Sequence, residues 1–195
     1  ALGRHCRRSD GTPVPLRTVS AGTRTGLVLQ IDDPAQLGAD IVTGAAAAVW
    51  LYGTPVAVLD FGTATVLSCV DANRTLLGVS IAPGMQTSLD GLRGAAALIP
   101  HVELRAPESV LGRNTADSVR AGVVYGTAAM ADGLVERTLR EAHLPPDTPV
   151  VATGGLAGLI LPFCRRRMHR EDALTLYGLY RVFALTARRE ALRKK

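Results

Sequence analysis

The clearest strand pattern in the sequence is Val56-Ala-Val-Leu-Asp-Phe-Gly-Thr-Ala-Thr-Val-Leu-Ser-Cys-Val70. It begins with a short apolar run, which is typical of a buried strand, and continues through a carboxylate and a glycine turn. A second strand is predicted over Thr65–Val70, and the turn Asp71–Arg74 leads into a third strand over Leu76–Ala82. The stretch therefore predicts a set of hairpin-linked strands.

Helical patterns lie on both sides of these strands in the sequence. Upstream, Asp33-Pro34 supplies an N-cap followed by a proline at the first helical position, which predicts a helix that runs to Tyr52 and ends at Gly53. Further strands are predicted over Gly26–Ile31 and Val150–Thr153, and further helices over Met85–Ile99, Asn114–Ala142, Leu156–Phe163 and Leu174–Leu192. Hairpin-linked strands followed by helical crossovers indicate an α/β fold with a mixed sheet.

The composition is that of one globular domain, or of one domain and part of another. The chain has 195 residues, of which 47% are hydrophobic and 20% charged, and its formal net charge is +5. This modest positive charge suits an anionic small ligand, but it falls short of the basic surface that nucleic-acid binding requires. We therefore expect no nucleic-acid partner.

Lysine is absent from the body of the chain. Of the 22 basic residues only Lys194 and Lys195 are lysines, and all the others are arginines. A Walker-type phosphate loop, a protein kinase and a pyridoxal enzyme each need a lysine inside the folded domain. These enzyme classes are excluded, and phosphate must be bound without an ammonium group.

Cysteine and histidine favour neither a disulfide framework nor a zinc site. The three cysteines, Cys6, Cys69 and Cys164, are far apart, and none of the 4 histidines is spaced for a shared metal. A reduced, cytoplasmic protein fits best. The uncharged stretch Ile41–Leu59 is long enough for a membrane span, but the turn Tyr52–Pro55 interrupts it, so we expect no membrane contact.

Two glycine turns follow predicted buried strands and could carry chemistry. In Asp60-Phe-Gly-Thr-Ala-Thr65, backbone N–H groups and threonine hydroxyls could bind phosphate while Asp60 holds a cation. In Ala152-Thr-Gly-Gly-Leu-Ala157, the missing side chains leave room for a nucleotide against the backbone. Taken singly, each turn is more often structural, with glycines in a tight turn and an aspartate as a cap.

Together with five further motifs, these turns resemble one family in order and spacing. The further motifs are Gly38-Ala-Asp40, Ile81-Ala-Pro-Gly84, Val110-Leu-Gly-Arg-Asn-Thr115, Ala121-Gly-Val-Val-Tyr-Gly126 and Asp132-Gly133. Between Val19 and Leu185 the chain is similar to type III pantothenate kinases, a family that includes the Bvg accessory factors and belongs to the actin-like and sugar-kinase superfamily. The resemblance implies a ribonuclease H-like mixed sheet with helices, one of two such halves that close on ATP.

The same resemblance implies an activity. The expected protein is an ATP-dependent kinase that phosphorylates the primary hydroxyl of pantothenate, or of a similar small hydroxy acid, in coenzyme A biosynthesis. Besides ATP it would need Mg²⁺ or another divalent cation, and a monovalent cation, K⁺ or NH₄⁺. A homodimer is also implied, because Thr115 matches a family threonine that contacts the pantothenate carboxylate from the neighbouring subunit.

The family's site residues map onto this sequence by motif. Asp40 matches the catalytic base that accepts the proton of the substrate hydroxyl, Gly38 belongs to the same substrate motif, and Asp60 matches the carboxylate on the cation side. Asp40 lies in a predicted helix that is otherwise rich in apolar residues, so we expect it to be partly desolvated and a stronger base for that reason. The phosphate and nucleotide positions are Gly62, Thr63, Ala64, Thr65, Gly154 and Gly155.

The sequence also departs from the family pattern. The motif D-x-G-N-T, which the family uses to bind phosphate near its N-terminus, has no counterpart, and Ile41 stands where the family has arginine. We expect residues 1–52 to be a remnant of the N-terminal half with a linking helix, residues 53–195 to be the C-terminal ribonuclease H-like domain, and the gene product to extend upstream. The alternative is a non-catalytic paralogue with an accessory or regulatory role.

Arg165-Arg-Arg167 and Arg170 form a dense basic run in the sequence. A run of this kind is more often a solvated helix end or loop than a contact to phosphate or nucleic acid. We therefore predict a solvated loop, and association that depends steeply on salt would indicate the alternative.

Overall fold

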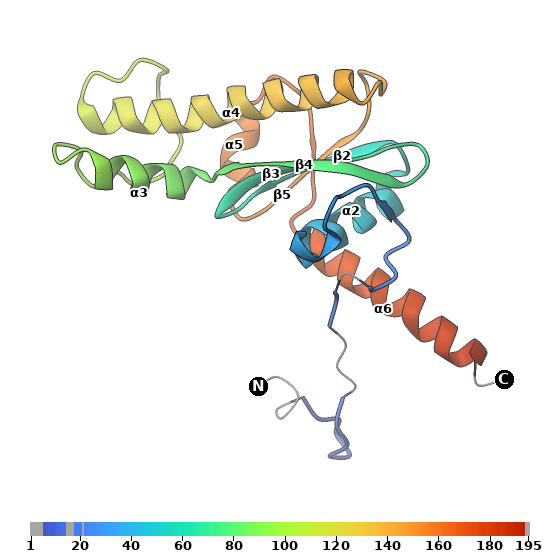
Figure 1. The fold of residues 1–195 in the computed structure, drawn as a ribbon. Helices are drawn as coiled ribbons and strands as arrows, with labels where there is room; N and C mark the ends of the chain where they lie inside the picture. Colours follow the sequence, from blue (N-terminus) through green and yellow to red (C-terminus); the bar gives the residue numbers. More distant parts are fainter. Residues whose placement is uncertain (1–5, 15–17, 21, 194–195) are drawn as a thin grey trace.

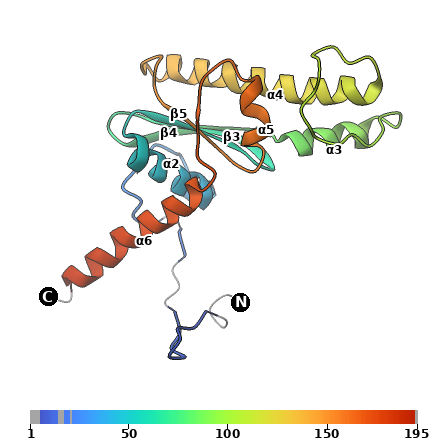
Figure 2. The same cartoon turned by 180° about the vertical axis from the view of Figure 1, so that it is seen from behind.

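The computed structural model describes residues 6–14, 18–20 and 22–193. In this part of the chain six strands form one sheet in the order β1-β4-β3-β2-β5-β6, with helices on both faces (Figures 1 and 2). The strands are β1 (Val28–Leu29), β2 (Val56–Phe61), β3 (Ala64–Val70), β4 (Thr75–Pro83), β5 (Val150–Thr153) and β6 (His169–Arg170). The helices are the 3-10 helix η1 (Pro34–Gln36), α2 (Ala39–Tyr52), α3 (Met85–Ala95), α4 (Thr115–Glu141), α5 (Ala157–Ile160), the 3-10 helix η2 (Leu161–Phe163) and α6 (Leu174–Arg193).

The sheet is mixed, as the sequence predicts. β2, β3 and β4 are antiparallel neighbours, β5 pairs in parallel with β2, and β6 pairs in parallel with β5. At the other edge the short strand β1 pairs in parallel with β4. The predicted α/β fold class is therefore confirmed, and β6 is an addition, because two residues are too few to show an alternating pattern in a sequence.

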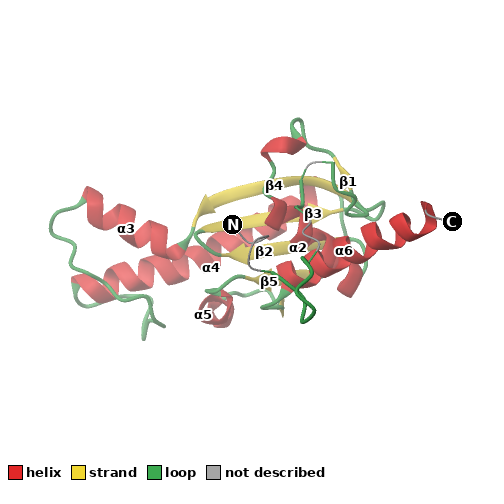
Figure 3. Cartoon of the chain, turned by 90° about the horizontal axis from the view of Figure 1, so that it is seen from below, coloured by secondary structure: helices red, strands yellow, loops and turns green. Residues whose placement is uncertain are grey.

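Each face of the sheet has its own apolar core. α4 and α5 cover one face, where Leu59, Phe61 and Leu67 of the sheet pack against Val124 and Val135 of α4. α2 and α6 lie on the other face (Figures 1 and 3). The core on that side contains residues from α2, from the sheet and from the first turn of α6, namely Ala45, Ala47, Ala48, Val49, Val56, Val58, Val70, Leu76, Val151 and Leu174. Because strand side chains alternate between the two faces, the position of each residue in β2 decides which core it joins.

The predicted helix from Asp33 to Tyr52 is divided into two pieces, so that prediction was wrong at its start. The Asp33 side chain accepts a hydrogen bond from the backbone N–H of Ala35 and caps only the 3-10 helix η1. Leu37 is extended, with φ −77° and ψ 127°, and α2 begins anew after Gly38. At the other end the prediction is confirmed, because the chain leaves α2 at Gly53 with φ 80°.

Two other boundaries differ from the predictions. β2 continues two residues beyond Leu59 to Phe61, which pairs with Thr65, so Asp60 is part of the sheet and not the first residue of a turn. α3 ends at Ala95, before Ile99, because Ala96 is extended.

One end of the molecule extends beyond the sheet. Figure 1 shows α3 and the N-terminal part of α4 side by side past the ends of β2 and β4. On the connection between them, Leu98 is 95% exposed and Leu111 is 78% exposed. This extension, called the arm below, comprises α3, residues 96–114 and the first turns of α4. No helix in the described part of the chain is long and apolar enough to cross a membrane.

Candidate functional site

Two aspartates from different elements share one region at the C-terminal end of β2. Asp60 is in phase with Val56 and Val58, which pack in the core beneath α2, so its side chain lies on the α2 face of the sheet. Asp40 lies in the first turn of α2, and its charge interacts with Asp60. The fold therefore brings together the two carboxylates that the sequence assigns to the substrate and to the cation.

The two carboxylates differ in their environment. Burial, followed by the repulsion from Asp40, raises the pKa of Asp60 above its ordinary value of 3.8. Asp40 is exposed, with one carboxylate oxygen accepting the backbone N–H of Ile41. The expectation of a desolvated Asp40 was wrong, because Asp40 occupies the open first turn of the helix, where the apolar residues that follow it do not cover it.

The second glycine turn packs directly against Asp60. Gly154 has φ +93°, and a Cβ there would lie 2.6 Å from the carbonyl carbon and oxygen of Phe61 and would also touch Oδ1 of Asp60. The backbone N–H of Leu156 donates a hydrogen bond of 3.1 Å to the carbonyl of Phe61. These contacts join the turn after β5 to the end of β2.

The first glycine turn is held by the start of α3. The N–H of Gly62 donates to the carbonyl of Ala64 at 3.0 Å, and the carbonyl of Thr63 accepts from the N–H of Gly84 at 3.0 Å. The Thr87 hydroxyl donates to that same carbonyl at 2.7 Å. The Thr63 side chain is exposed, so its hydroxyl can reach a ligand at the end of the sheet.

A cleft of about 250 Å³ opens between the second turn and the start of α6. It is lined by Asp60, Thr153, Gly154, Gly155, Arg170, Asp172 and Thr175. The sequence predicted Asp60 and both glycines as site residues. It missed the residues contributed by β6 and α6, because a two-residue strand gives no signal that would place them at this edge of the sheet.

Thr65 does not face this cleft. It pairs with Phe61 and lies on the α4 face of the sheet, where it is 2% exposed and its hydroxyl makes no hydrogen bond within the described residues. Thr115 is also outside the cleft, at the exposed start of α4 on the arm. Gly38 and Asp40 do not line the cleft either, but Gly38 is the N-cap of α2, and a Cβ at this position would touch the Asp40 carboxylate.

The pair of aspartates is suited to a divalent cation that also binds phosphate. Among the described residues, no group of three or more His, Cys, Asp or Glu side chains could hold a metal ion. Mg²⁺ commonly binds proteins through one or two carboxylates and takes its remaining ligands from substrate phosphates and water. The Asp60 carboxylate meets this requirement, and a cation bound there would also relieve its repulsion from Asp40.

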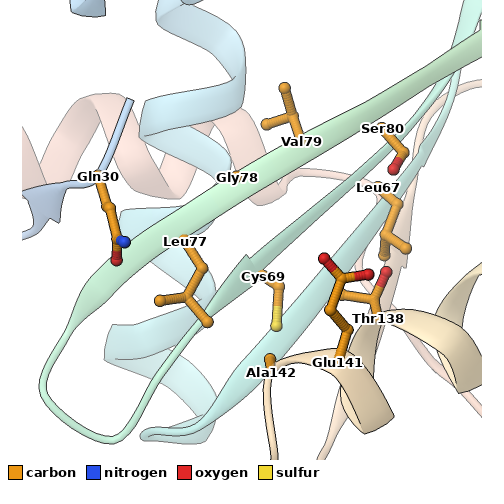
Figure 4. Close-up of a pocket in the computed structure, with 10 residues that line it drawn as sticks. All are labelled: Gln30, Leu67, Cys69, Leu77, Gly78, Val79, Ser80, Thr138, Glu141 and Ala142. Carbon is orange, nitrogen blue, oxygen red and sulfur yellow. The ribbon is translucent and has the colours of Figure 1, made fainter. Parts of the chain in front are cut away.

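A second cavity, of about 370 Å³, contains none of the predicted site residues (Figure 4). It lies between β4 and the end of α4, and Leu67, Cys69, Thr138 and Glu141 are among the residues that line it. Burial, with a smaller contribution from Asp71, raises the pKa of the Cys69 thiol to about 11. The thiol is therefore protonated at neutral pH, which disfavours a role as nucleophile.

The arginine run is a loop fixed by hydrogen bonds. The buried carboxylate of Asp132 accepts the backbone N–H groups of Arg165 and Arg166 at 2.8 and 3.1 Å. The Arg166 guanidinium donates to the carbonyls of Pro146 and Thr148 at 2.6 and 3.0 Å. The prediction of a solvated loop is confirmed for Arg165, whose side chain is 84% exposed, whereas Arg166 joins the loop to the start of β5.

Comparisons with known proteins agree with the motifs. A model of the type III pantothenate kinase family matches residues 3–137. Type III pantothenate kinases from Frankia casuarinae and Streptomyces avermitilis are 42% and 43% identical over 170 and 171 residues, which is 87% of this chain and 67% and 64% of those proteins. A solved structure of a conserved Baf family protein from Campylobacter jejuni has the same fold, with a TM-score of 0.58 and 16% identity over 84% of this chain and 71% of that one.

The chain spans about two thirds of the length of the curated relatives that it matches. The family model nevertheless covers more than half of the chain, and the matched part contains both aspartates and the first glycine turn. On this evidence the chain belongs to the type III pantothenate kinase family.

Proposed function

We propose that this protein transfers the terminal phosphate of ATP to the primary hydroxyl of pantothenate, a step of coenzyme A biosynthesis. The observation that carries the proposal is that Asp60, at the end of β2, packs against Gly154 and lies within the electrostatic influence of Asp40. Membership of the family names the reaction, and this arrangement supports it. Phosphoryl transfer depends on positioning and on charge stabilisation, both of which carboxylates and backbone amides can supply without lysine.

In this proposal each side chain has one task. Asp40, exposed at the first turn of α2, accepts the proton of the substrate hydroxyl and orients its oxygen toward the γ-phosphate. Asp60 would hold a divalent cation, which when bound neutralises charge on the phosphate oxygens. The exposed Thr63 hydroxyl offers a donor to phosphate, Gly62 and Ala64 keep side-chain bulk away from that turn, and Gly154 and Gly155 line the cleft that would receive the nucleotide.

A monovalent cation, K⁺ or NH₄⁺, belongs to the proposal through the family resemblance alone. So does the division of the chain into residues 1–52 and 53–195, which stays a prediction. The C-terminal part of that division contains β2 to β6, and the helix that carries Asp40 lies in the other part. The site that we propose therefore needs both parts.

The test is the conversion of ATP to ADP by the purified chain, with and without pantothenate, together with mass spectrometry of the product. We expect conversion that requires pantothenate, and a loss of kcat of about 10²-fold or more in Asp40→Asn, the usual range for a general base. Asp147→Asn is the matched control, since Asp147 is exposed and lies before β5, at the opposite end of that strand. Equal ADP formation with and without pantothenate contradicts the proposed substrate, and an unimpaired Asp40→Asn contradicts the base.

We also propose a homodimer in which Thr115 of one copy completes the site of the other. Thr115 does not line the cleft of its own chain, and it lies on an arm that extends beyond the sheet. Leu98 and Leu111 expose apolar surface on the same arm, as expected for a surface that another protein covers.

A mixing experiment tests this arrangement. Asp40→Asn and Thr115→Val should each be inactive alone. If Thr115 acts across the dimer, mixed dimers contain one intact site, and random exchange should restore about a quarter of the wild-type activity. No restoration after subunit exchange means that Thr115 acts within its own chain or not at all.

A further inference from the structure

Arg170 is the only cation among the residues that line the cleft, within the part of the chain that the structure describes. The other charged side chains there are Asp60 and Asp172, and Asp40 lies close to Asp60. A nucleoside triphosphate carries several negative charges, so carboxylates alone would repel it. A positive group of the protein that faces the phosphates would offset this repulsion together with the bound cation, and Arg170 is placed to do so.

The guanidinium of Arg170 is held in a defined orientation. Its Nε and Nη2 atoms donate to the two carboxylate oxygens of Asp172 at 2.7 and 2.9 Å, which is the bidentate geometry that fixes the plane of the group. Its Nη1 side lies over α5, where a Cβ at Gly158 would be 2.6 Å from Nη1. The absence of a side chain at Gly158 therefore leaves the space that the guanidinium occupies.

This arrangement leaves donors for a ligand. A guanidinium has five N–H groups, and the two bonds to Asp172 use two of them. No other hydrogen bond from Arg170 to a described residue is present. The arginines of the neighbouring loop differ, since Arg166 donates to backbone carbonyls and Arg165 lies 3.7 Å from the Asp132 carboxylate.

We propose that Arg170 binds a phosphate group of the nucleotide in this cleft, and that Asp172 and Gly158 set its orientation. The inference rests on the proposed function, because it assumes that the cleft between Asp60 and α6 receives ATP. It also answers the question raised by the composition, since Lys194 and Lys195 are the only lysines and a planar arginine is well suited to phosphate.

The test compares three ligands by isothermal titration calorimetry: ATP with Mg²⁺, inorganic tripolyphosphate, and adenosine. In Arg170→Gln the Kd values of ATP and tripolyphosphate should rise about ten- to hundred-fold, the range for hydrogen bonds to a charged partner, while adenosine binds as in the wild type. Arg167→Gln is the matched control, since Arg167 is an exposed arginine of the same run and does not line the cleft. An unchanged Kd for ATP, or an equal loss for adenosine, overturns the assignment.

Arg170→Lys is a second variant that keeps the test valid if Arg170→Gln does not fold. Lysine keeps the charge but cannot donate two parallel bonds to Asp172, so its affinity for ATP should lie between those of the wild type and Arg170→Gln. If Arg170→Lys binds ATP as weakly as Arg170→Gln while both keep the wild-type melting temperature, geometry and not charge is decisive, and the phosphate contact still stands. If Arg170→Lys binds ATP like the wild type and Arg170→Gln fails to fold, the role of Arg170 is structural and the inference is wrong.

Failure of the inference can be told apart from failure of the proposed function. If ATP binding depends on Arg170 but pantothenate is not phosphorylated, the inference stands and the proposed substrate is wrong. Turnover of pantothenate with an unchanged KM for ATP in Arg170→Gln keeps the function and removes the inference.

Discussion

The two glycine turns end at the same place but are built differently. Gly154 has a positive φ, and a Cβ at this position would clash with the backbone of Phe61 at the end of β2. Gly62 has no positive φ, and a Cβ there would meet only ordinary contacts, the nearest being Oδ1 of Asp60 at 3.5 Å. The fold therefore requires a glycine at position 154 in the second turn, but it does not require one at position 62 in the first turn.

This difference separates structure from function at two positions that look alike in the sequence. A glycine that is required by its backbone says little about a ligand, because the fold alone explains it. At Gly62, where the fold does not require a glycine, the phosphate that we propose beside the turn would give a reason for one. Variants at this end of the sheet can test the distinction.

The largest effect is expected at Asp60, which touches both turns. Asp60→Asn removes the carboxylate that would hold the cation, and we expect kcat/KM for ATP to fall by about 10²- to 10³-fold, the cost of losing one strong electrostatic contact to the reacting group. Steady-state kinetics over a range of Mg²⁺ concentrations provide the measurement. Activity within a few-fold of the wild type at low Mg²⁺ would contradict the role of Asp60.

The same variant should be more stable than the wild type, with a defined dependence on pH. Because the pKa of Asp60 is raised in the folded protein, its ionisation favours the unfolded chain, so its contribution to stability falls as pH rises from 3.8 through the folded-state pKa. In urea unfolding at several pH values, the free energy of unfolding of Asp60→Asn relative to the wild type should increase as the pH rises through that window. If the difference in free energy of unfolding between the two proteins does not change with pH, then burial and Asp40 do not raise the pKa of Asp60.

Next in size is the direct comparison of the turns. Gly154→Ala introduces a methyl group against backbone atoms at an unfavourable φ, and we expect a loss of about 2–4 kcal/mol in the free energy of unfolding. Gly62→Ala should leave stability within about 1 kcal/mol of the wild type, or raise it, because alanine restricts the unfolded chain. Denaturant titration of both variants measures the difference, and equal losses would remove the distinction drawn here.

A smaller effect is expected where α3 holds the first turn. Thr87→Val keeps the shape of the side chain but removes the hydrogen bond of 2.7 Å to the carbonyl of Thr63. The expected loss in the free energy of unfolding is about 1 kcal/mol. Because the turn would be less well fixed, the KM for ATP should rise as well, whereas Thr186→Val, which breaks a comparable bond within α6, should leave it unchanged.

The sequence predicted more of the fold than of the site. Apolar runs and turn residues gave β2 to β5 and α4, because buried strands and long helices leave clear patterns. The joint role of Asp40 and Asp60 was reached through the resemblance and stays a prediction, and in the structure the first turn of α2 carries Asp40 close enough for its charge to act on Asp60. Arg170 and Asp172 could not be placed, because their position depends on β6, which only tertiary pairing creates.

Thr65 shows a second limit of sequence reasoning. It belongs to a motif that predicts phosphate binding, but its side chain points away from the cleft. Thr65 points to the same face as Leu67, two residues on, so its hydroxyl lies on the α4 face, buried and without a hydrogen bond in the described part of the chain.

Thr65→Val replaces that hydroxyl by a methyl group of similar volume, so it removes an unpaired polar atom without opening a cavity. We expect the smallest effect of the series, a change of stability between zero and a gain of about 1 kcal/mol, with the KM for ATP unchanged. Thr63→Val, two residues earlier and exposed, should instead raise the KM for ATP and leave stability as it is. If Thr65→Val impairs ATP binding and Thr63→Val does not, the phosphate contact comes from the α4 face, and the division between a structural and a functional side of this turn is wrong.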